Sequence, residues 1–199
     1  MKSKVAILIV GETRTWDSQH AKPPNVSMEN VDVSGNWKMF KQNHPEIDIY
    51  GVTWDYCKQP KDDSIFKKIY TLDFNGKEFK NEALEHIASS DALESDPRKI
   101  GFLYNSVAQH FQWLYGIDKI FKSDDYQLVL KVRWDIFPTS PEKKLDLLST
   151  LITPTPTLFV SKLVNNEYKI PCWIDMIFIV NRILWEKGIK DIDMGKRIA

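Results

Sequence analysis

Two short apolar runs constrain the fold of this chain more than any other feature of its sequence. Residues 5–10 and 128–132 are rich in apolar side chains at successive positions, where a strand with one solvated face would alternate apolar and polar residues. Such runs are typical of parallel strands that helices cover on both faces. We therefore predict that the two runs are buried parallel strands, next to each other or nearly so.

Further strand-like segments alternate with helix-like segments along the chain. The additional expected strands are residues 47–54, 66–74, 158–164 and 173–180, and the second apolar run lies in an expected strand at residues 126–135. The expected helices are residues 37–44, 78–88 and 98–121, the last with a start signal at Asp96-Pro97, and a short helix capped by Asn181. This alternation predicts an α/β fold with a largely parallel sheet flanked by helices.

Length, charge and cysteine content narrow the class of protein. The 199 residues, 43% of them hydrophobic, suffice for one well-buried core, so residues 1–199 are expected to form a single domain. Lys plus Arg total 27 and Asp plus Glu total 27, which leaves no net charge to attract nucleic acid or an anionic membrane. Cys57 and Cys172 lack the spacing of a disulfide framework or zinc site. The first apolar run is too short for a membrane span, and together these features predict a cytoplasmic protein.

Polar residues gather where the expected strands end. Residues 11–16 follow the first strand, residues 53–55 end the second, and residues 133–135 end the long apolar strand. The carboxyl ends of parallel strands meet at one edge of a sheet, where ligands bind. We therefore expect these segments to converge on one pocket, with Arg14 within about 15 Å of Asp135.

Single residues at this edge suit a ligand that carries phosphate. Gly11 would let a ligand approach the backbone closely, and Arg14 can hold a phosphate through two parallel hydrogen bonds. Asp135 suits a hard cation such as Mn²⁺ or Mg²⁺, which would bridge diphosphate oxygens. Structural alternatives remain, because a glycine after a strand commonly marks a turn and Asp135 can cap the turn before Pro138. The sequence has neither a GxGxxG fingerprint nor a Walker A lysine motif.

Tryptophans also stand at the expected strand ends. Trp16, Trp54 and Trp134 could each stack on a nucleobase or a sugar ring. Packing in the core beneath loops is the alternative for each, so we expect one of the three to act as such a platform. The four histidines are scattered without metal-ligand spacing, which indicates surface or core histidines.

In their order along the chain, these motifs resemble a family of bacterial and viral glycosyltransferase-like proteins. The matching segments are KVAILIVGETRTW, TWD, the aromatic-rich residues 102–115, YQLVLKVRWDIF and WIDMIFIV. The family has a start of the type ISGQ-R-TW, then YDxVIRxRxDxxF, then DQFAxG. The resemblance implies a single GT-A-like, Rossmann-like domain that binds a nucleotide-diphospho-sugar. An acid after a central strand would there replace the DxD metal motif.

The resemblance also implies roles for individual residues. Arg14 would contact the donor nucleotide or phosphate, Asp135 would be the metal-linked acid with Arg133 beside it, and Asp175 would match the aspartate of the DQF motif. The donor-binding residues expected at this edge are Gly11, Thr13, Arg14, Trp16, Thr53, Asp55 and Arg133. This sequence departs from the pattern in having Gly-Glu at residues 11–12, a single acid in Arg-Trp-Asp, and Ile-Asp-Met around Asp175.

Metal-assisted sugar transfer from a nucleotide-diphospho-sugar to an acceptor hydroxyl is therefore the expected function. Mn²⁺ or Mg²⁺ at Asp135, with Arg14 or Arg133, would neutralise the leaving diphosphate. Asp175 is the first candidate for the base in an inverting reaction, although an acid beside an apolar strand also suits a turn cap.

Two other classes of function stay open. One is a nucleotide or nucleotide-sugar binding module without transfer activity. The other is a viral protein that modifies DNA bases with sugar, whose basic groove would include Lys58, Lys61, Lys67 and Lys68. The acceptor would accordingly be a glycan or modified DNA.

Overall fold

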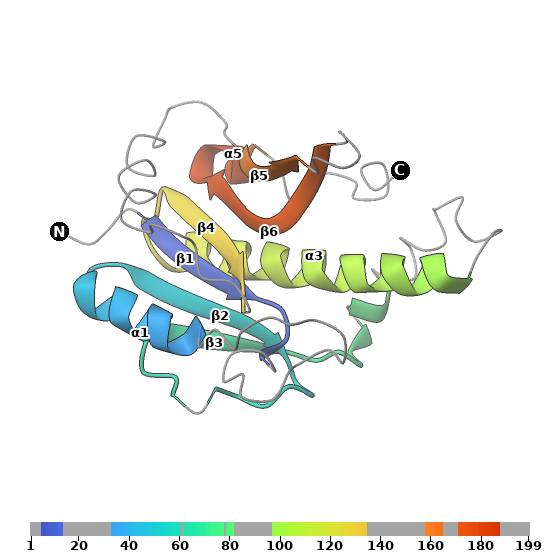
Figure 1. Cartoon of the computed structure of the whole chain (residues 1–199), viewed down its shortest axis with the longest axis horizontal. Helices are drawn as coiled ribbons and strands as arrows, with labels where there is room; N and C mark the ends of the chain where they lie inside the picture. The colour runs from blue at the N-terminus through green and yellow to red at the C-terminus, as the bar shows by residue number, and fades with distance from the viewer. Residues whose placement is uncertain are drawn as a thin grey trace.

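A six-stranded mixed sheet forms the centre of the molecule (Figure 1). The computed structural model describes residues 5–13, 33–60, 62–77, 79–81, 97–134, 158–164 and 171–187, with backbone alone for 97–107, 158–164 and 171–178. The elements are β1 (Val5–Val10), α1 (Val33–Asn43), β2 (Asp48–Trp54), β3 (Phe66–Leu72), α3 (Pro97–Ser123), β4 (Leu128–Arg133), β5 (Leu158–Val164), β6 (Pro171–Asn181) and α5 (Arg182–Glu186). The strand order is β3-β2-β1-β4-β6-β5.

The two apolar runs of the sequence are adjacent parallel strands, as predicted. β1 pairs in parallel with β4 from Val5↔Leu128 to Val10↔Arg133, and every residue of β1 is buried. On its other side β1 pairs in parallel with β2, and β2 pairs in parallel with β3. Burial in β4 includes Lys131, a lysine inside the run that the sequence pattern treats as apolar.

The expectation of a parallel sheet holds for β3, β2, β1 and β4 and fails for β6. This strand pairs antiparallel with both β4 and β5. Only residues 165–170 separate β5 from β6, whereas a crossover between parallel strands needs a dozen residues or more. The short connection therefore requires an antiparallel pair, and the sheet is mixed.

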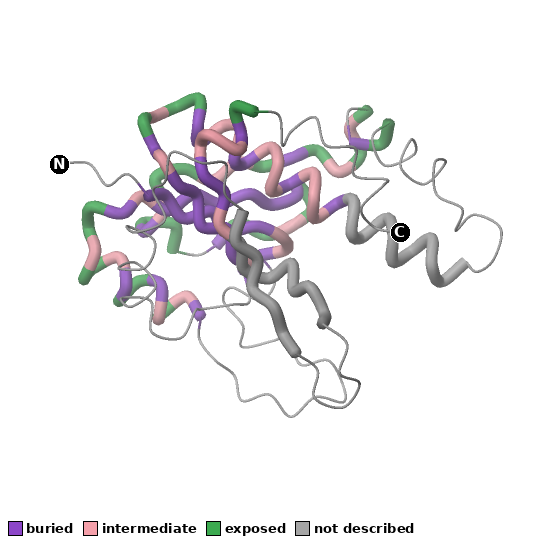
Figure 2. Tube along the Cα trace, turned by 90° about the horizontal axis from the view of Figure 1, so that it is seen from above, coloured by how far each residue is buried: buried purple, intermediate pink, exposed green. Residues whose placement is uncertain are grey.

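Helices cover the two faces of the sheet. α3 packs on the face that carries Leu8 and Val52, and α1 packs on the face that carries Ile7 and Ile9. α3 lies close to the sheet at Gly116, where an added Cβ would come within 2.8 Å of Leu8. Figure 2 shows buried residues along the central strands.

Most predicted elements are confirmed with shifted ends. α1 begins four residues before the predicted start at residue 37, and β3 ends at Leu72 because a turn follows, in which the Gly76 amide donates to the Asp73 carbonyl (3.1 Å). α3 starts at Pro97, and Asn181 caps α5 by accepting from the Leu184 amide (2.9 Å). Residues 79–81 are helical, and the rest of the predicted helix 78–88 lies outside the described residues, as does Asp96. No helix within the described ranges combines the length and apolar character that crossing a membrane requires.

Candidate functional site

The candidate site lies at the sheet edge where β1, β2 and β4 end. These strands are parallel, so the residues that follow them, 11–13, 55–58 and 134, emerge at one edge. With 27 residues α3 is about 40 Å long, roughly twice the length of a six-residue strand. Figure 1 shows the first half of α3 extending past the strand ends. The site is therefore bounded by strand ends and one long helix.

Side chains connect the loops that follow β1 and β2. The Thr13 hydroxyl donates to the Lys58 carbonyl, and the Tyr56 hydroxyl donates to Glu12 Oε1 at 3.1 Å. The two loops thus contact each other directly through Tyr56 and Lys58, which follow the predicted segment 53–55, and a pocket shared with Asp135 stays a prediction. Thr13 is buried in this contact, so its hydroxyl already has a structural role.

Gly11 forms a turn at the end of β1 that favours glycine. Its φ of 114° lies in a region that side chains other than glycine rarely adopt. Its carbonyl accepts a hydrogen bond from Gln112 Nε2 of α3 at 3.3 Å. Gly11 therefore joins the end of β1 to the helix that borders the site.

The two predicted site residues at the end of β2 differ in their surroundings. Thr53 is fully buried, and its hydroxyl has no hydrogen-bond partner in the part of the chain that the structure describes. Asp55 is exposed and accepts from the Phe74 amide at 3.1 Å, while its own amide donates to the Leu72 carbonyl at 2.8 Å. Asp55 thus closes the connection to β3, and its role in donor binding remains a prediction.

Two of the three candidate stacking tryptophans are core residues. Trp134 is buried, its Nε1 donates to the Val52 carbonyl at 3.1 Å, and its ring crosses Gly51, where an added Cβ would lie 3.1 Å away. Trp54 is buried against Phe111, with ring centroids 6.3 Å apart. Trp54 and Trp134 are therefore not the stacking platform that was expected at one of the three tryptophans. Trp16 lies outside the described residues.

Several predicted site residues cannot be placed at this edge. Arg14 and Asp135 lie outside the described residues, as does Trp16, so the expected separation of Arg14 and Asp135 stays a prediction. Arg133 is half-buried at the end of β4. In the described part of the chain, no three His, Cys, Asp or Glu side chains gather in a group able to hold a metal ion. Binding of Mn²⁺ or Mg²⁺ by Asp135 remains a proposal.

The backbone at Asp175 belongs to an irregular part of β6. The sequence pattern predicts a strand that starts at residue 173 with Asp175 at its head, but β6 starts at Pro171, so Asp175 lies inside the strand. From Trp173 to Phe178, five residues along β6, the partner strand advances by only two, from Lys162 to Val160. Figure 1 shows β6 sharply bent. Strand bulges commonly occur beside active sites, and the antiparallel direction of β6 brings this half of the strand toward the edge where β4 ends.

Sequence reasoning missed Gln112, a polar residue in the buried face of α3. Gln112 is fully buried, and its Oε1 has no hydrogen-bond partner among the described residues. Gln109, one turn earlier, also has a buried Oε1 without a partner there. The signal was present in the sequence, because Gln112 lies four residues after Ala108 and four before Gly116, both on the sheet-facing side.

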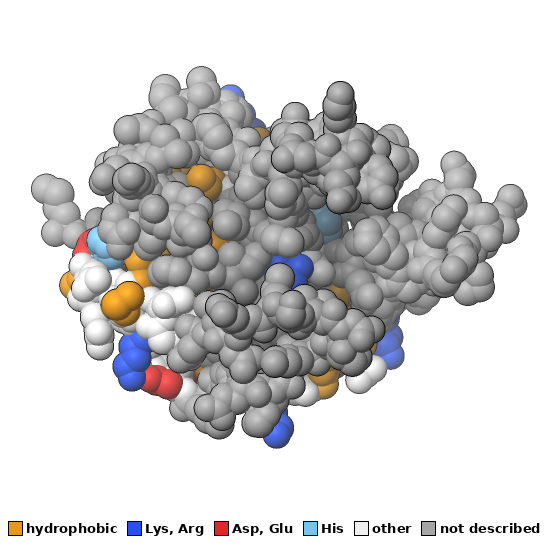
Figure 3. All heavy atoms as spheres, viewed as in Figure 1, with side chains coloured by type: hydrophobic (Ala, Val, Ile, Leu, Met, Phe, Trp, Pro, Cys, Tyr) orange, Lys and Arg blue, Asp and Glu red, His pale blue; other side chains and the backbone are white. Residues whose placement is uncertain are grey.

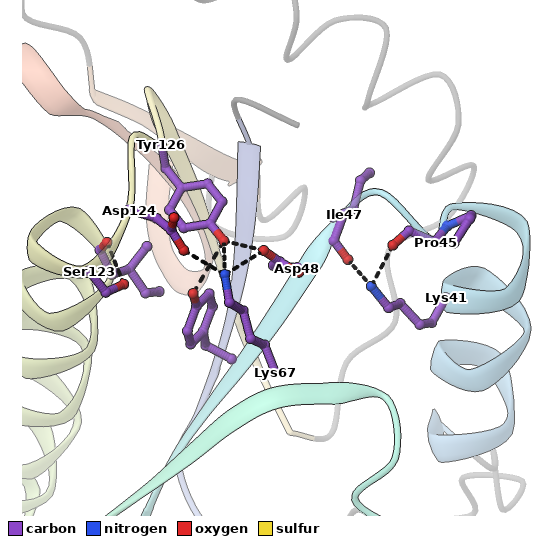
Figure 4. A network of polar contacts seen from close by, with 10 residues as sticks. Lys41, Pro45, Ile47, Asp48, Lys67, Ser123, Asp124 and Tyr126 are labelled. Carbon is purple, nitrogen blue, oxygen red and sulfur yellow. Dashed lines mark hydrogen bonds and ion pairs between the residues drawn. The ribbon is translucent and has the colours of Figure 1, made fainter. Parts of the chain in front are cut away.

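A second polar cluster lies at the opposite edge of the sheet (Figure 4). Lys67 Nζ is 2.8 Å from Asp48 Oδ2, 2.5 Å from Asp124 Oδ2 and 2.9 Å from the Tyr126 hydroxyl, which donates to Asp48 and lies 3.2 Å from the Tyr50 hydroxyl. Burial opposes the charge of Lys67, but hydrogen bonds to the two carboxylates outweigh it and raise the Lys67 pKa. Burial likewise opposes the charge of Asp48, and the bonds from Lys67 and Tyr126 outweigh it and lower the Asp48 pKa. The cluster joins the starts of β2, β3 and β4.

The lysines considered for a DNA groove do not line one surface. Lys67 is paired with two carboxylates, and Lys68 lies over the Tyr70 ring at 4.8 Å. Both lie near the start of β3, whereas Lys58 follows the end of β2 at the opposite edge of the sheet. Lys61 lies outside the described residues. On the face in Figure 3 the coloured Lys and Arg side chains stand apart from one another. The described residues therefore do not favour a nucleic-acid groove built from these lysines.

Comparisons with known proteins assign no family to this chain. No protein-family model matches it, and no curated protein matches it at a significant level of sequence similarity. A solved structure described as a transferase mutant aligns over 89% of this chain and 72% of its own, with a TM-score of 0.38 and 9% identity. A likeness at this level carries no argument about function.

Proposed function

We propose that this protein is a glycosyltransferase with a GT-A-like fold that moves a sugar from a nucleotide-diphospho-sugar to an acceptor hydroxyl. The observation that carries the proposal is the edge where parallel β1, β2 and β4 end beside α3, with Gly11, Arg133 and the loop contacts of Thr13 and Tyr56. Ligands of open α/β sheets bind at such edges. The order of sequence motifs, which resembles that of glycosyltransferase-like proteins, supports the sugar donor.

The proposed chemistry divides between charge neutralisation and proton removal. Arg14 and Arg133 would hold the donor diphosphate, whose negative charge grows as the glycosidic bond breaks. Asp135 would hold Mn²⁺ or Mg²⁺, and the ion would supply further neutralisation of the leaving group. Asp175 would accept the proton of the acceptor hydroxyl in an inverting reaction.

Replacing Asp135 tests this assignment most selectively. Asp135→Asn retains the shape of the side chain but removes its negative charge, so Mn²⁺-dependent donor turnover should fall roughly 100- to 1000-fold. The melting temperature should move by no more than a few degrees, because a carboxylate at a strand end contributes little to the core. Asp125→Asn is the matched control, since Asp125 is exposed and precedes β4 at the opposite edge. Equal turnover by wild type and Asp135→Asn would remove Asp135 from the mechanism.

A further inference from the structure

Tyr56 presents an exposed aromatic ring at the candidate site. It is 55% exposed, and among the described residues Met39 is the other large hydrophobic residue of similar exposure. Its hydroxyl donates to Glu12, and its ring meets Phe74 nearly edge-on, with centroids 5.1 Å apart at 81°. Phe74 in turn packs against the buried Trp54. Contacts at the ring edge and at the hydroxyl therefore fix the orientation of Tyr56 while much of the ring faces solvent.

A buried side chain of α3 holds the residue that precedes Glu12. Gln112 is fully buried, and its amide nitrogen is bonded to the Gly11 carbonyl, one residue before Glu12. Its Oε1 has no hydrogen-bond partner among the described residues. Gln112 therefore fixes the backbone next to Glu12, while its enclosed Oε1 is not itself available to a ligand.

We propose that Tyr56 and Glu12 form a subsite for a ring that carries neighbouring hydroxyl groups. The ring would stack on Tyr56, and its hydroxyls would donate to the Glu12 carboxylate. The negative charge of the Glu12 carboxylate disfavours a phosphate group here. The phosphates of the donor are therefore assigned to the end of β4, where Arg133 lies. A wholly apolar ring would cover the Glu12 carboxylate without donating a hydrogen bond to it.

This subsite rests on the proposed function and makes it more specific. The shared chemistry, a ring with neighbouring hydroxyls, has two sources in a nucleotide-sugar reaction, the ribose of the donor and a sugar. The ribose source predicts that a 2′-deoxynucleotide binds more weakly than the ribonucleotide and that Glu12→Gln abolishes this difference. The sugar source predicts that free glucose, galactose or N-acetylglucosamine binds and that both nucleotides bind equally.

Titration calorimetry on the full chain tests the subsite. The probes are UDP, GDP, CDP, their 2′-deoxy forms and the three free sugars. Tyr56→Ala should weaken binding of the responding probe roughly 10- to 100-fold, and Glu12→Gln about tenfold. Tyr56→Phe keeps the ring and should retain most of the affinity. Thermal unfolding of each variant confirms that it is folded.

Two control variants match these substitutions away from the edge. Met39→Ala removes the other exposed large hydrophobic residue, which lies in α1, and Glu46→Gln neutralises an exposed acid that pairs with His44. Both should bind the responding probe as wild type does. An equal loss of affinity in the controls would contradict a local role for Tyr56 and Glu12.

The outcomes separate the subsite from the proposed function. Nucleotide binding that Tyr56→Ala and Glu12→Gln leave unchanged overturns the subsite and leaves the proposed function standing. Sugar binding that depends on Tyr56, with no nucleotide bound, supports the subsite and contradicts the nucleotide-sugar donor. If wild type binds none of the probes, the subsite is overturned.

Discussion

Removing Lys67 should destabilise the protein measurably without affecting the candidate site. Lys67→Met keeps the aliphatic length of the side chain but leaves Asp48 and Asp124 without the cation that both contact. The carboxylates are 23% and 22% exposed, so their negative charges lie close together in a partly desolvated position. The variant therefore tests whether this cluster holds the starts of β2, β3 and β4 together.

The size of the effect follows from three hydrogen bonds and their exposure. Each hydrogen bond to a charged group contributes about 1.5–3 kcal/mol when shielded from water. The Lys67 side chain is 35% exposed, so water compensates for much of the lost interaction. We therefore expect Lys67→Met to lower the free energy of unfolding by about 2 kcal/mol in total. For a chain of this size that corresponds to a fall of roughly 4–8 °C in the melting temperature.

The pH dependence of this loss has a defined sign. The Asp48 pKa is lowered in the folded state from its ordinary 3.8, so the stability it contributes is present above about pH 4 and is lost as pH falls through the folded pKa. The Lys67 pKa is raised, so its contribution is complete below its ordinary pKa of 10.5. The difference between wild type and Lys67→Met should therefore be full at pH 7 and shrink below pH 4.

Thermal unfolding followed by circular dichroism at pH 7 and pH 3 measures this prediction. Lys38→Met is the matched control, because Lys38 and Asp62 form an ion pair with both side chains about half exposed. It should change the melting temperature by less than about 2 °C. A melting temperature for Lys67→Met within that range at pH 7, or an equal fall in the control, would refute the reasoning.

Two further substitutions test the packing that forms the site. Gly116→Ala should lower the free energy of unfolding by about 1–3 kcal/mol although alanine favours helices, because the new Cβ would lie 2.8 Å from Leu8 and 2.9 Å from Val52. A stability equal to that of wild type in denaturant titration would contradict this close packing and show that α3 can shift. Trp134→Phe should lower the free energy of unfolding by about 2–3 kcal/mol, since it removes the hydrogen bond to the Val52 carbonyl and part of a buried ring. An unchanged melting temperature would contradict the role of Trp134 in the core.

The core strands could be predicted because their pattern is local. Successive apolar residues in β1 and β4 identify strands covered on both faces, and the structure pairs these strands. The antiparallel direction of β6 is not part of that pattern, since a buried strand has the same composition in either direction. The connection between β5 and β6 does indicate an antiparallel pair, because its six residues are fewer than the dozen or so that a crossover between parallel strands needs.

The details of the candidate site depend on contacts that the sequence does not reveal. Trp134 turns into the core because Gly51, 83 positions earlier, leaves room for its ring. Tyr56 is exposed although its neighbour Trp54 is buried, since Tyr56 follows the end of β2 and Trp54 lies within the strand. Strand-end position thus predicts the location of the candidate site, while long-range packing decides which aromatic ring at that edge is exposed.

A thermal-shift panel of nucleotide diphosphates and nucleotide-sugars, with and without Mn²⁺, tests the central claim most directly. A ligand that binds only the folded protein raises the melting temperature of the protein by mass action. At a free ligand concentration 100 times the dissociation constant, the free energy of unfolding rises by about 2.7 kcal/mol. If the protein is a nucleotide-sugar-dependent transferase, at least one nucleotide-sugar should raise the melting temperature, and Mn²⁺ should increase the shift. No shift with any member of the panel, at millimolar concentration and with Mn²⁺ present, would contradict the claim.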